Sequence, residues 1–220
     1  MDFLKFYNLL NFVSPVILIV GLIFGFYTYR SLDVIHKSIT VYLAVMLLVD
    51  ITGRIFGHYR GNNLIVLLAY SLIELLLFLY FYYKFLFKIQ HKVIIGLSVL
   101  AISYIFWEIY VFNPDAKKFQ TYSKIVDNFM IIMLALAFFY EKISVFKESK
   151  WNNFKLNAVI LVFFSINMLF FLPYNFIINA AIGFWFWLGI LISTSLFYLY
   201  LINSIWKNGR TRRLLPSGSR

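Results

Sequence analysis

The chain alternates between seven long apolar runs and short polar connections. A helix of about 20 apolar residues crosses the hydrocarbon core of a bilayer, and the runs are close to that length. Because a spanning segment must satisfy its backbone hydrogen bonds internally, we expect each run to be a helix. The pattern predicts an all-α, polytopic transmembrane bundle of seven helices, at residues 14–29, 39–56, 64–83, 93–112, 122–140, 156–173 and 176–200.

The connections between these runs are short. The longest, residues 141–155, is polar and basic and cannot form a folded domain by itself. We therefore expect one seven-helix transmembrane domain over residues 1–206, followed by a basic cytoplasmic tail over residues 207–220.

Composition supports a membrane protein. Hydrophobic residues make up 62% of the chain and charged residues 13%, with a mean hydropathy of +0.83, whereas soluble proteins carry roughly a quarter charged residues. The absence of cysteine excludes disulfides and thiolate metal sites. The three histidines, His36, His58 and His91, lack metal-ligand spacing. We expect no cofactor, and we find no catalytic motif that would favour an enzyme.

The distribution of basic residues predicts the orientation. The formal net charge is +11, but the basic residues lie at the ends of apolar runs, which argues against a nucleic-acid partner. The first, third and fifth connections and the tail hold Arg30, Lys37, Lys84, Lys88, Lys92, Lys142, Lys147, Lys150, Lys155, Lys207, Arg210, Arg212, Arg213 and Arg220; the other side holds Lys5, Arg60, Lys117 and Lys118. Positive residues favour the cytoplasm, so we expect a multi-pass inner-membrane protein with its N-terminus outside and its C-terminus in the cytoplasm.

Acidic residues inside the apolar runs are the main candidates for function. Glu74 is the eleventh residue of its run, and Asp50 and Asp127 lie inside two others. Intramembrane charges are costly and face the bundle interior or water. We predict an outward-facing polar pocket formed by Asp50, Arg54, Glu74, Lys124, Asp127 and Asn128, in which Arg54 and Lys124 hold an anionic group and Glu74 binds a proton or cation.

A structural role is the alternative for the same residues. Asp50 with Arg54, and Lys124 with Asp127, are spaced to form pairs that hold helices together. Glu108, near the outer end of its run, is interpreted as a solvated helix end.

Two G-x-x-x-G motifs, at Gly21–Gly25 and Gly53–Gly57, predict close helix contacts. A seven-helix bundle has many inward surfaces, so we expect packing within the chain rather than dimerisation.

Two stretches carry a resemblance to a known family. The stretches NNLIVLLAYSLIELLLFLYFYYKFL (residues 62–86) and FQTYSKIVDNFMIIMLALAFFYEKI (residues 119–143) cover about a fifth of the chain. They resemble small seven-helix bacterial membrane proteins of unassigned activity, with Asn63 and Glu74 at characteristic positions. Members tend to be encoded beside sensor histidine kinases, so the resemblance implies such a kinase, or another membrane protein, as a partner besides the lipid bilayer.

Three functions fit these observations. The leading hypothesis is a sensory or signalling subunit that binds something in its outer half. The alternative is a small proton- or cation-coupled transporter or channel that uses Glu74 and Asp127. The third is a lipid-modifying enzyme, because carboxylates alone can act as acid and base.

Overall fold

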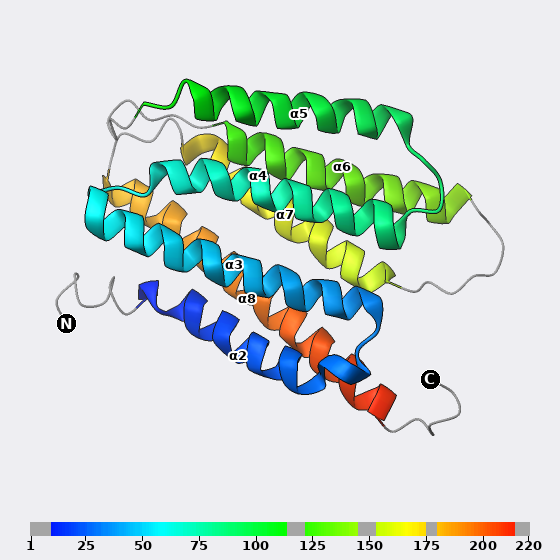
Figure 1. Cartoon of the computed structure of the whole chain (residues 1–220). Helices are drawn as coiled ribbons and strands as arrows, with labels where there is room; N and C mark the ends of the chain where they lie inside the picture. Colours follow the sequence, from blue (N-terminus) through cyan, green and yellow to red (C-terminus); the bar gives the residue numbers. More distant parts are fainter. Residues whose placement is uncertain (1–9, 114–121, 145–152, 175–179, 214–220) are drawn as a thin grey trace. The chain divides into compact units, whose positions relative to one another are not determined.

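Figure 1 shows a computed structural model of the protein, which describes residues 10–113, 122–144, 153–174 and 180–213. Within these ranges seven helices are long and apolar enough to cross a membrane, and no strand occurs. The predicted all-α bundle of seven helices is confirmed. The helices are α2 (Val13–Thr28), α3 (Val34–Arg60), α4 (Leu64–Phe81), α5 (Lys92–Tyr110), α6 (Ser123–Ser144), α7 (Phe154–Tyr174) and α8 (Ala180–Arg213).

Several helices are longer than the apolar runs that predicted them. Helix α3 begins five residues before its run, and α8 continues to Arg213, well past residue 200. The apolar criterion marks only the part of a helix suited to hydrocarbon, while polar residues such as His36 and Lys37 continue the same helix beyond it. The predicted start of the seventh run, residue 176, lies outside the described residues.

Local residue chemistry explains where two of the helices end. Gly61 follows α3 with a φ of 73°, the left-handed conformation in which a helix commonly terminates and which glycine adopts without strain. Helix α4 ends in a π-helical turn, η2 (Tyr82–Leu86), closed by the Phe87 N–H, which donates to the Tyr82 carbonyl at 2.8 Å. The next residues lead directly into α5 at Lys92.

The chain forms two compact units, and α3 and α8 contribute residues to both. The first unit contains Met1–Thr52 and Leu191–Arg220, as far as these are described. Gly21 and Gly25 of α2 lie buried in it. A Cβ atom at Gly21 would lie 2.7 Å from Ile202 Cγ1, and one at Gly25 would lie 2.5 Å from Thr40 Cγ2. The prediction of close intramolecular packing at this motif is confirmed.

The second G-x-x-x-G motif is different. A Cβ at Gly53 would make only ordinary contacts at 3.7 Å, and one at Gly57 would meet no atom within 4 Å among the described residues. The prediction of a close approach at this motif is wrong, because its glycines face open space or loosely packed neighbours.

The second unit, Gly53–Ile190, is organised around α6. This helix packs against α4, α5 and α7, and it is the most deeply buried of the seven spans. Its fully buried residues include Ile131, Leu134 and Ala135, while Phe78 of α4 and Phe164 of α7 meet edge to face at 5.0 Å. Figure 1 shows α4, α5, α6 and α7 running alongside one another.

Most other helices expose large apolar side chains, such as Phe26, Leu100 and Leu169. In water such surfaces would favour aggregation, but hydrocarbon solvates them. Together with the seven spans, this distribution identifies a multi-pass membrane protein.

Candidate functional site

A buried lysine, Lys124, is the second residue of α6. Its side chain is 2% exposed and donates to two carboxylates, Glu74 Oε2 on α4 and Asp127 Oδ2 on α6. The Lys124 Nζ to Asp127 Oδ2 distance is 2.5 Å. Glu74 and Asp127 are both fully buried. We call Glu74, Lys124 and Asp127 the acid–lysine cluster.

Helical spacing positions the members of this cluster. Lys124 and Asp127 are three residues apart on α6, so their side chains share one face. On α4, the Tyr70 hydroxyl donates to Glu74 Oε1 at 2.9 Å from one turn earlier. The Tyr70 ring also lies 4.2 Å from Lys124 Nζ, a distance at which the π-face attracts the ammonium group. One tyrosine therefore supports both halves of the interhelical ion pair.

Glu74 lies well inside its membrane-spanning helix, whereas Lys124 and Asp127 lie near the start of theirs. Glu74 is ten residues from the start of α4, which is about 15 Å along a helix that rises 1.5 Å per residue. Two carboxylates against one ammonium leave one excess negative charge when all three groups are ionised. An uncompensated buried charge is strongly unfavourable, so this arrangement favours binding of a proton or a cation.

Some polar atoms beside the cluster have no hydrogen-bond partner in the described part of the chain. These atoms are Asp127 Oδ1 and both side-chain polar atoms of Asn128, and each is shielded from solvent. On α7, Asn167 Oδ1 is also buried and has no hydrogen-bond partner among the described residues. Buried polar groups are normally hydrogen-bonded, so unpartnered atoms beside an ion cluster indicate capacity for a further proton, water or ligand.

The environment of Glu108 on α5 differs from the one predicted from the sequence. The interpretation of Glu108 as a solvated helix end is wrong, since the residue is buried. Its carboxylate accepts from the Tyr122 N–H at 3.1 Å and from the Ser123 hydroxyl at 2.5 Å. These donors lie at the start of α6, where backbone N–H groups lack helical partners and negative charge is favourable. Glu108 thus caps the helix that carries Lys124.

Asp50 and Arg54 are the other two charged residues of the predicted pocket. Asp50 is half-buried and belongs to the first unit, whereas Arg54 is exposed and belongs to the second. Among the described residues, the ammonium group of Lys124 forms ion pairs with Glu74 and Asp127. A pocket in which Arg54 and Lys124 hold an anion together, and a pair between Asp50 and Arg54, both stay predictions.

A second buried carboxylate, Glu141, lies at the other end of α6 and was not predicted from the sequence. Glu141 accepts from the backbone N–H groups of Lys88 and Ile89, the closest contacts being 3.0 and 3.4 Å, and lies 3.3 Å from His91 Nε2. It therefore holds the connection between α4 and α5 against α6. The sequence does not indicate this role, because Glu141 belongs to a polar stretch in which acidic side chains are usually exposed to solvent.

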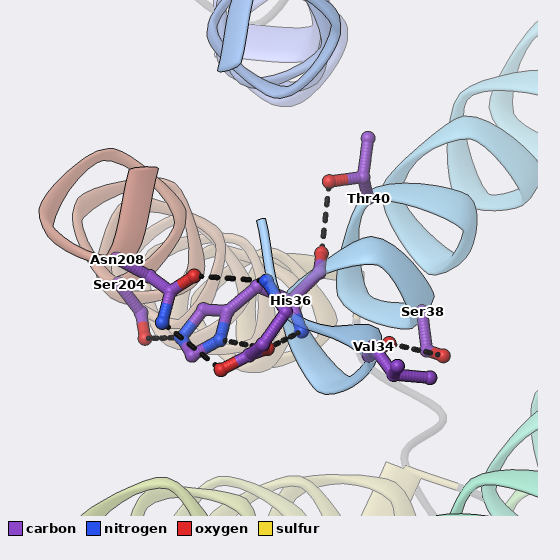
Figure 2. A network of polar contacts seen from close by, with 7 residues as sticks. Val34, His36, Ser38, Thr40, Ser204 and Asn208 are labelled. Atoms are coloured by element: carbon purple, nitrogen blue, oxygen red, sulfur yellow. Dashed lines mark hydrogen bonds and ion pairs between the residues drawn. The ribbon is translucent and has the colours of Figure 1, made fainter. Parts of the chain in front are cut away.

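A third polar network lies in the first unit, where α3 begins. The Asp33 carboxylate accepts from the His36 N–H at 2.8 Å and lies 2.7 Å from His36 Nδ1. Asp33 and Asn208 also exchange two hydrogen bonds, and His36 Nε2 lies 3.0 Å from the Ser204 hydroxyl. Figure 2 shows the imidazole of His36 beside Ser204 and Asn208 of α8.

This network changes the acidity of Asp33, which lies between the first two spans. Burial by itself would raise the pKa of Asp33. Hydrogen bonds from the side chain and backbone of His36, the positive charge that His36 can carry and a hydrogen bond from Asn208 outweigh it, so the pKa of Asp33 is lowered to about 2. The carboxylate form is therefore part of the structure that joins α3 to α8.

No family model, no curated protein and no solved structure matches this chain. The case for function therefore depends on the geometry of the acid–lysine cluster.

Proposed function

We propose that this chain is a small proton- or cation-coupled transporter of the inner membrane, with the acid–lysine cluster as its ion-binding site. The observation that carries the proposal is the complete burial of Lys124 between Glu74 and Asp127. Such a cluster is costly in a membrane, and intramembrane ionisable groups usually mark ion or substrate pathways. With the N-terminus outside, Lys124 and Asp127 belong to the outer half of α6.

Charge balance supports this role over a purely structural one. A single acid paired with Lys124 would be neutral and sufficient to join α4 to α6. The second acid makes the cluster able to exist in two states that differ by one bound positive charge. An ion-coupled cycle requires two such states.

The proposal is tested with purified protein in liposomes that contain a pH indicator. A proton gradient is imposed while potassium and valinomycin set the membrane potential. The wild type should acidify the interior faster than empty liposomes do. Glu74→Gln should reduce this to the rate of empty liposomes, because the Lys124–Asp127 pair that remains is already neutral.

Glu141→Gln is the matched control, because it removes a buried carboxylate of α6 that lies outside the cluster. It should keep wild-type flux. Equal rates in wild-type and empty liposomes, with sodium, potassium and protons as the ions tested, would rule out transport.

A sensory subunit, working with a histidine kinase or another membrane partner, is the second candidate. Helix α6 carries the cluster near one end and Glu141 near the other, about 25 Å apart at 1.5 Å per residue. A change at the cluster could therefore reach the Lys88–Ile89 backbone through one rigid helix. A sensor should show pH-dependent amide exchange at Lys88 and Ile89 that Glu74→Gln abolishes, without ion flux in liposomes.

A further inference from the structure

We infer that the ion bound by the cluster is a proton rather than a metal cation, and that it binds at Asp127 Oδ1. This inference rests on the proposed ion-coupled function and specifies which ion and which atom are involved. It follows from the different surroundings of the two carboxylates and from the position of Lys124.

Lys124 occupies the place that a metal cation would need. Its ammonium group contacts one oxygen of Glu74 and one of Asp127, and it lies over the Tyr70 ring. Hard cations require several oxygen ligands around one point. At the point between the two carboxylates, the ammonium group already occupies one oxygen of each. Among the residues that the structure describes, no cluster of three histidines, cysteines or acids is arranged to hold a metal ion. A proton needs only one oxygen.

Glu74 has a hydrogen-bond donor at each carboxylate oxygen. Its Oε1 accepts from the Tyr70 hydroxyl and its Oε2 accepts from the Lys124 ammonium group. Both oxygens therefore have donors, one of them charged. Hydrogen bonds donated to a carboxylate stabilise the charged form.

Only one of the two carboxylate oxygens of Asp127 has a hydrogen-bond donor among the described residues. Its Oδ2 accepts from Lys124, but its Oδ1 is buried and has no donor among the described residues. A buried acceptor without a partner is costly. A proton bound to Oδ1 forms one O–H bond, removes the excess charge of the cluster and converts the orphaned acceptor into a donor. Asn128, the next residue in the chain, is also buried, and its side-chain polar atoms have no partner among the described residues.

The other described groups near the cluster do not donate a hydrogen bond to Asp127 Oδ1. Helix α4 contributes Glu74 and Tyr70, which already bond to each other. On α5, the nearest described acid to the start of α6 is Glu108, whose carboxylate accepts from Tyr122 and Ser123. Helix α7 contributes the ring of Phe164, 5.9 Å from Lys124 Nζ.

The proton on Asp127 decides how Lys124 divides its interactions. When Asp127 is protonated, the charged partner of Lys124 is Glu74 alone, so the link between α4 and α6 is strongest. When Asp127 loses the proton, it competes for Lys124 from within α6. Proton release from Asp127 therefore weakens the interhelical link.

Infrared difference spectroscopy of the purified protein tests the inference. A pH step in the wild type should produce a C=O band of a protonated carboxyl group. Labelling with ¹³C in the aspartate side chain should shift this band, and labelling in the glutamate side chain should not. Asp127→Asn should remove it, whereas Glu141→Gln should leave it unchanged.

Other results overturn the inference. A band that shifts with glutamate labelling, a band that persists in Asp127→Asn, or no protonated carboxyl band between about pH 4 and 9 would each contradict it. Titration in sodium or potassium should match titration in N-methylglucamine, and competition by either metal ion would contradict the choice of a proton. If Asp127→Asn does not fold, isotope labelling of the wild type still shows whether an aspartate carries the proton. The cation titrations still show whether a metal ion competes with it.

These measurements are independent of transport. A protonated-carboxyl band from Asp127 without flux in liposomes would support the proton site and contradict the transport function. Flux without that band would support transport and contradict the assignment of the proton to Asp127.

Discussion

Glu74 of α4 and Lys124 of α6 form an ion pair between two helices, with no more than 2% of either side chain exposed. The residues are 50 positions apart in the chain. Asp127 shares the same ammonium group from within α6. One lysine therefore links the two helices. Because it is shared by two carboxylates, it neutralises only one of their two negative charges.

Replacing Lys124 by methionine should destabilise the protein strongly. Removing one partner of a buried ion pair typically costs about 3–5 kcal/mol, because the other charge is left uncompensated. The loss should be larger at pH 8 than at pH 5, since the two acids can become neutral only by taking up protons. Thermal unfolding in detergent at both pH values measures this.

The double variant Glu74→Gln/Lys124→Met separates this explanation from lost packing. It should be more stable than Lys124→Met alone, because one of the two orphaned charges is gone. Strictly additive losses from the two single variants would show that Glu74 and Lys124 do not interact.

Gly25→Ala should destabilise the first unit by about 1–3 kcal/mol, the usual range for an overpacked contact. The new methyl group would lie 2.5 Å from Thr40 Cγ2. Thr40 cannot easily rotate away, because its hydroxyl donates to the His36 carbonyl at 2.9 Å. Unfolding midpoints of the purified variants provide the test.

Gly57→Ala is the matched control for this contact. It adds the same methyl group to a helical glycine with no described atom within 4 Å. Since alanine favours helix by up to about 1 kcal/mol over glycine, Gly57→Ala should be neutral or stabilising. Equal effects at both glycines would contradict the packing explanation.

The Asp33 network should contribute stability that is lost only in strong acid. The pKa of Asp33 is lowered to about 2 in the folded protein, below its ordinary value of 3.8. A lowered carboxyl pKa stabilises the fold above the ordinary value, and this contribution disappears as the pH falls through the folded value. The stability difference between wild type and Asp33→Asn should therefore be constant near pH 5 and shrink towards pH 2.

Asp33→Ala extends this test. Asparagine caps a helix about as well as aspartate, whereas alanine loses the cap and costs about 0.5–2 kcal/mol more. The additional loss in Asp33→Ala should persist at every pH. A wild-type advantage over Asp33→Asn that stays the same down to pH 2 would exclude the charge explanation.

Glu141→Ala should loosen the connection between α4 and α5. The carboxylate accepts from the N–H groups of Lys88 and Ile89, and hydrogen bonds to charged groups contribute about 1.5–3 kcal/mol. Amide hydrogen exchange at these two positions should accelerate roughly tenfold or more. Glu141→Gln, which keeps an acceptor oxygen, should accelerate it less, and unchanged exchange in both variants would remove this role from Glu141.

The orientation is testable with reporter fusions. A reporter placed after Arg213 should be active only in the cytoplasm, and one placed at Asp115 should report from the outside, because the basic residues cluster on the C-terminal side. The reverse pattern would place the acid–lysine cluster in the inner half of the membrane.

The sequence by itself determined the features that depend on neighbouring residues. Seven apolar runs predicted seven helices, because length and hydropathy decide whether a segment can span hydrocarbon. The spacing of Lys124 and Asp127 on one helix predicted their pairing, and the small residues Gly21 and Gly25 predicted a close contact within the chain. These inferences need only helical geometry and the solvent.

Only the tertiary structure decided which helices exchange polar contacts. Glu74 meets Lys124, and Glu108 and Glu141 each accept backbone hydrogen bonds from another segment, yet the sequence placed Glu108 in solvent and did not single out Glu141. In a soluble helix the apolar stripe reveals the buried face. In hydrocarbon both faces of a spanning helix are apolar, so periodicity does not identify the inward side or the helix opposite it.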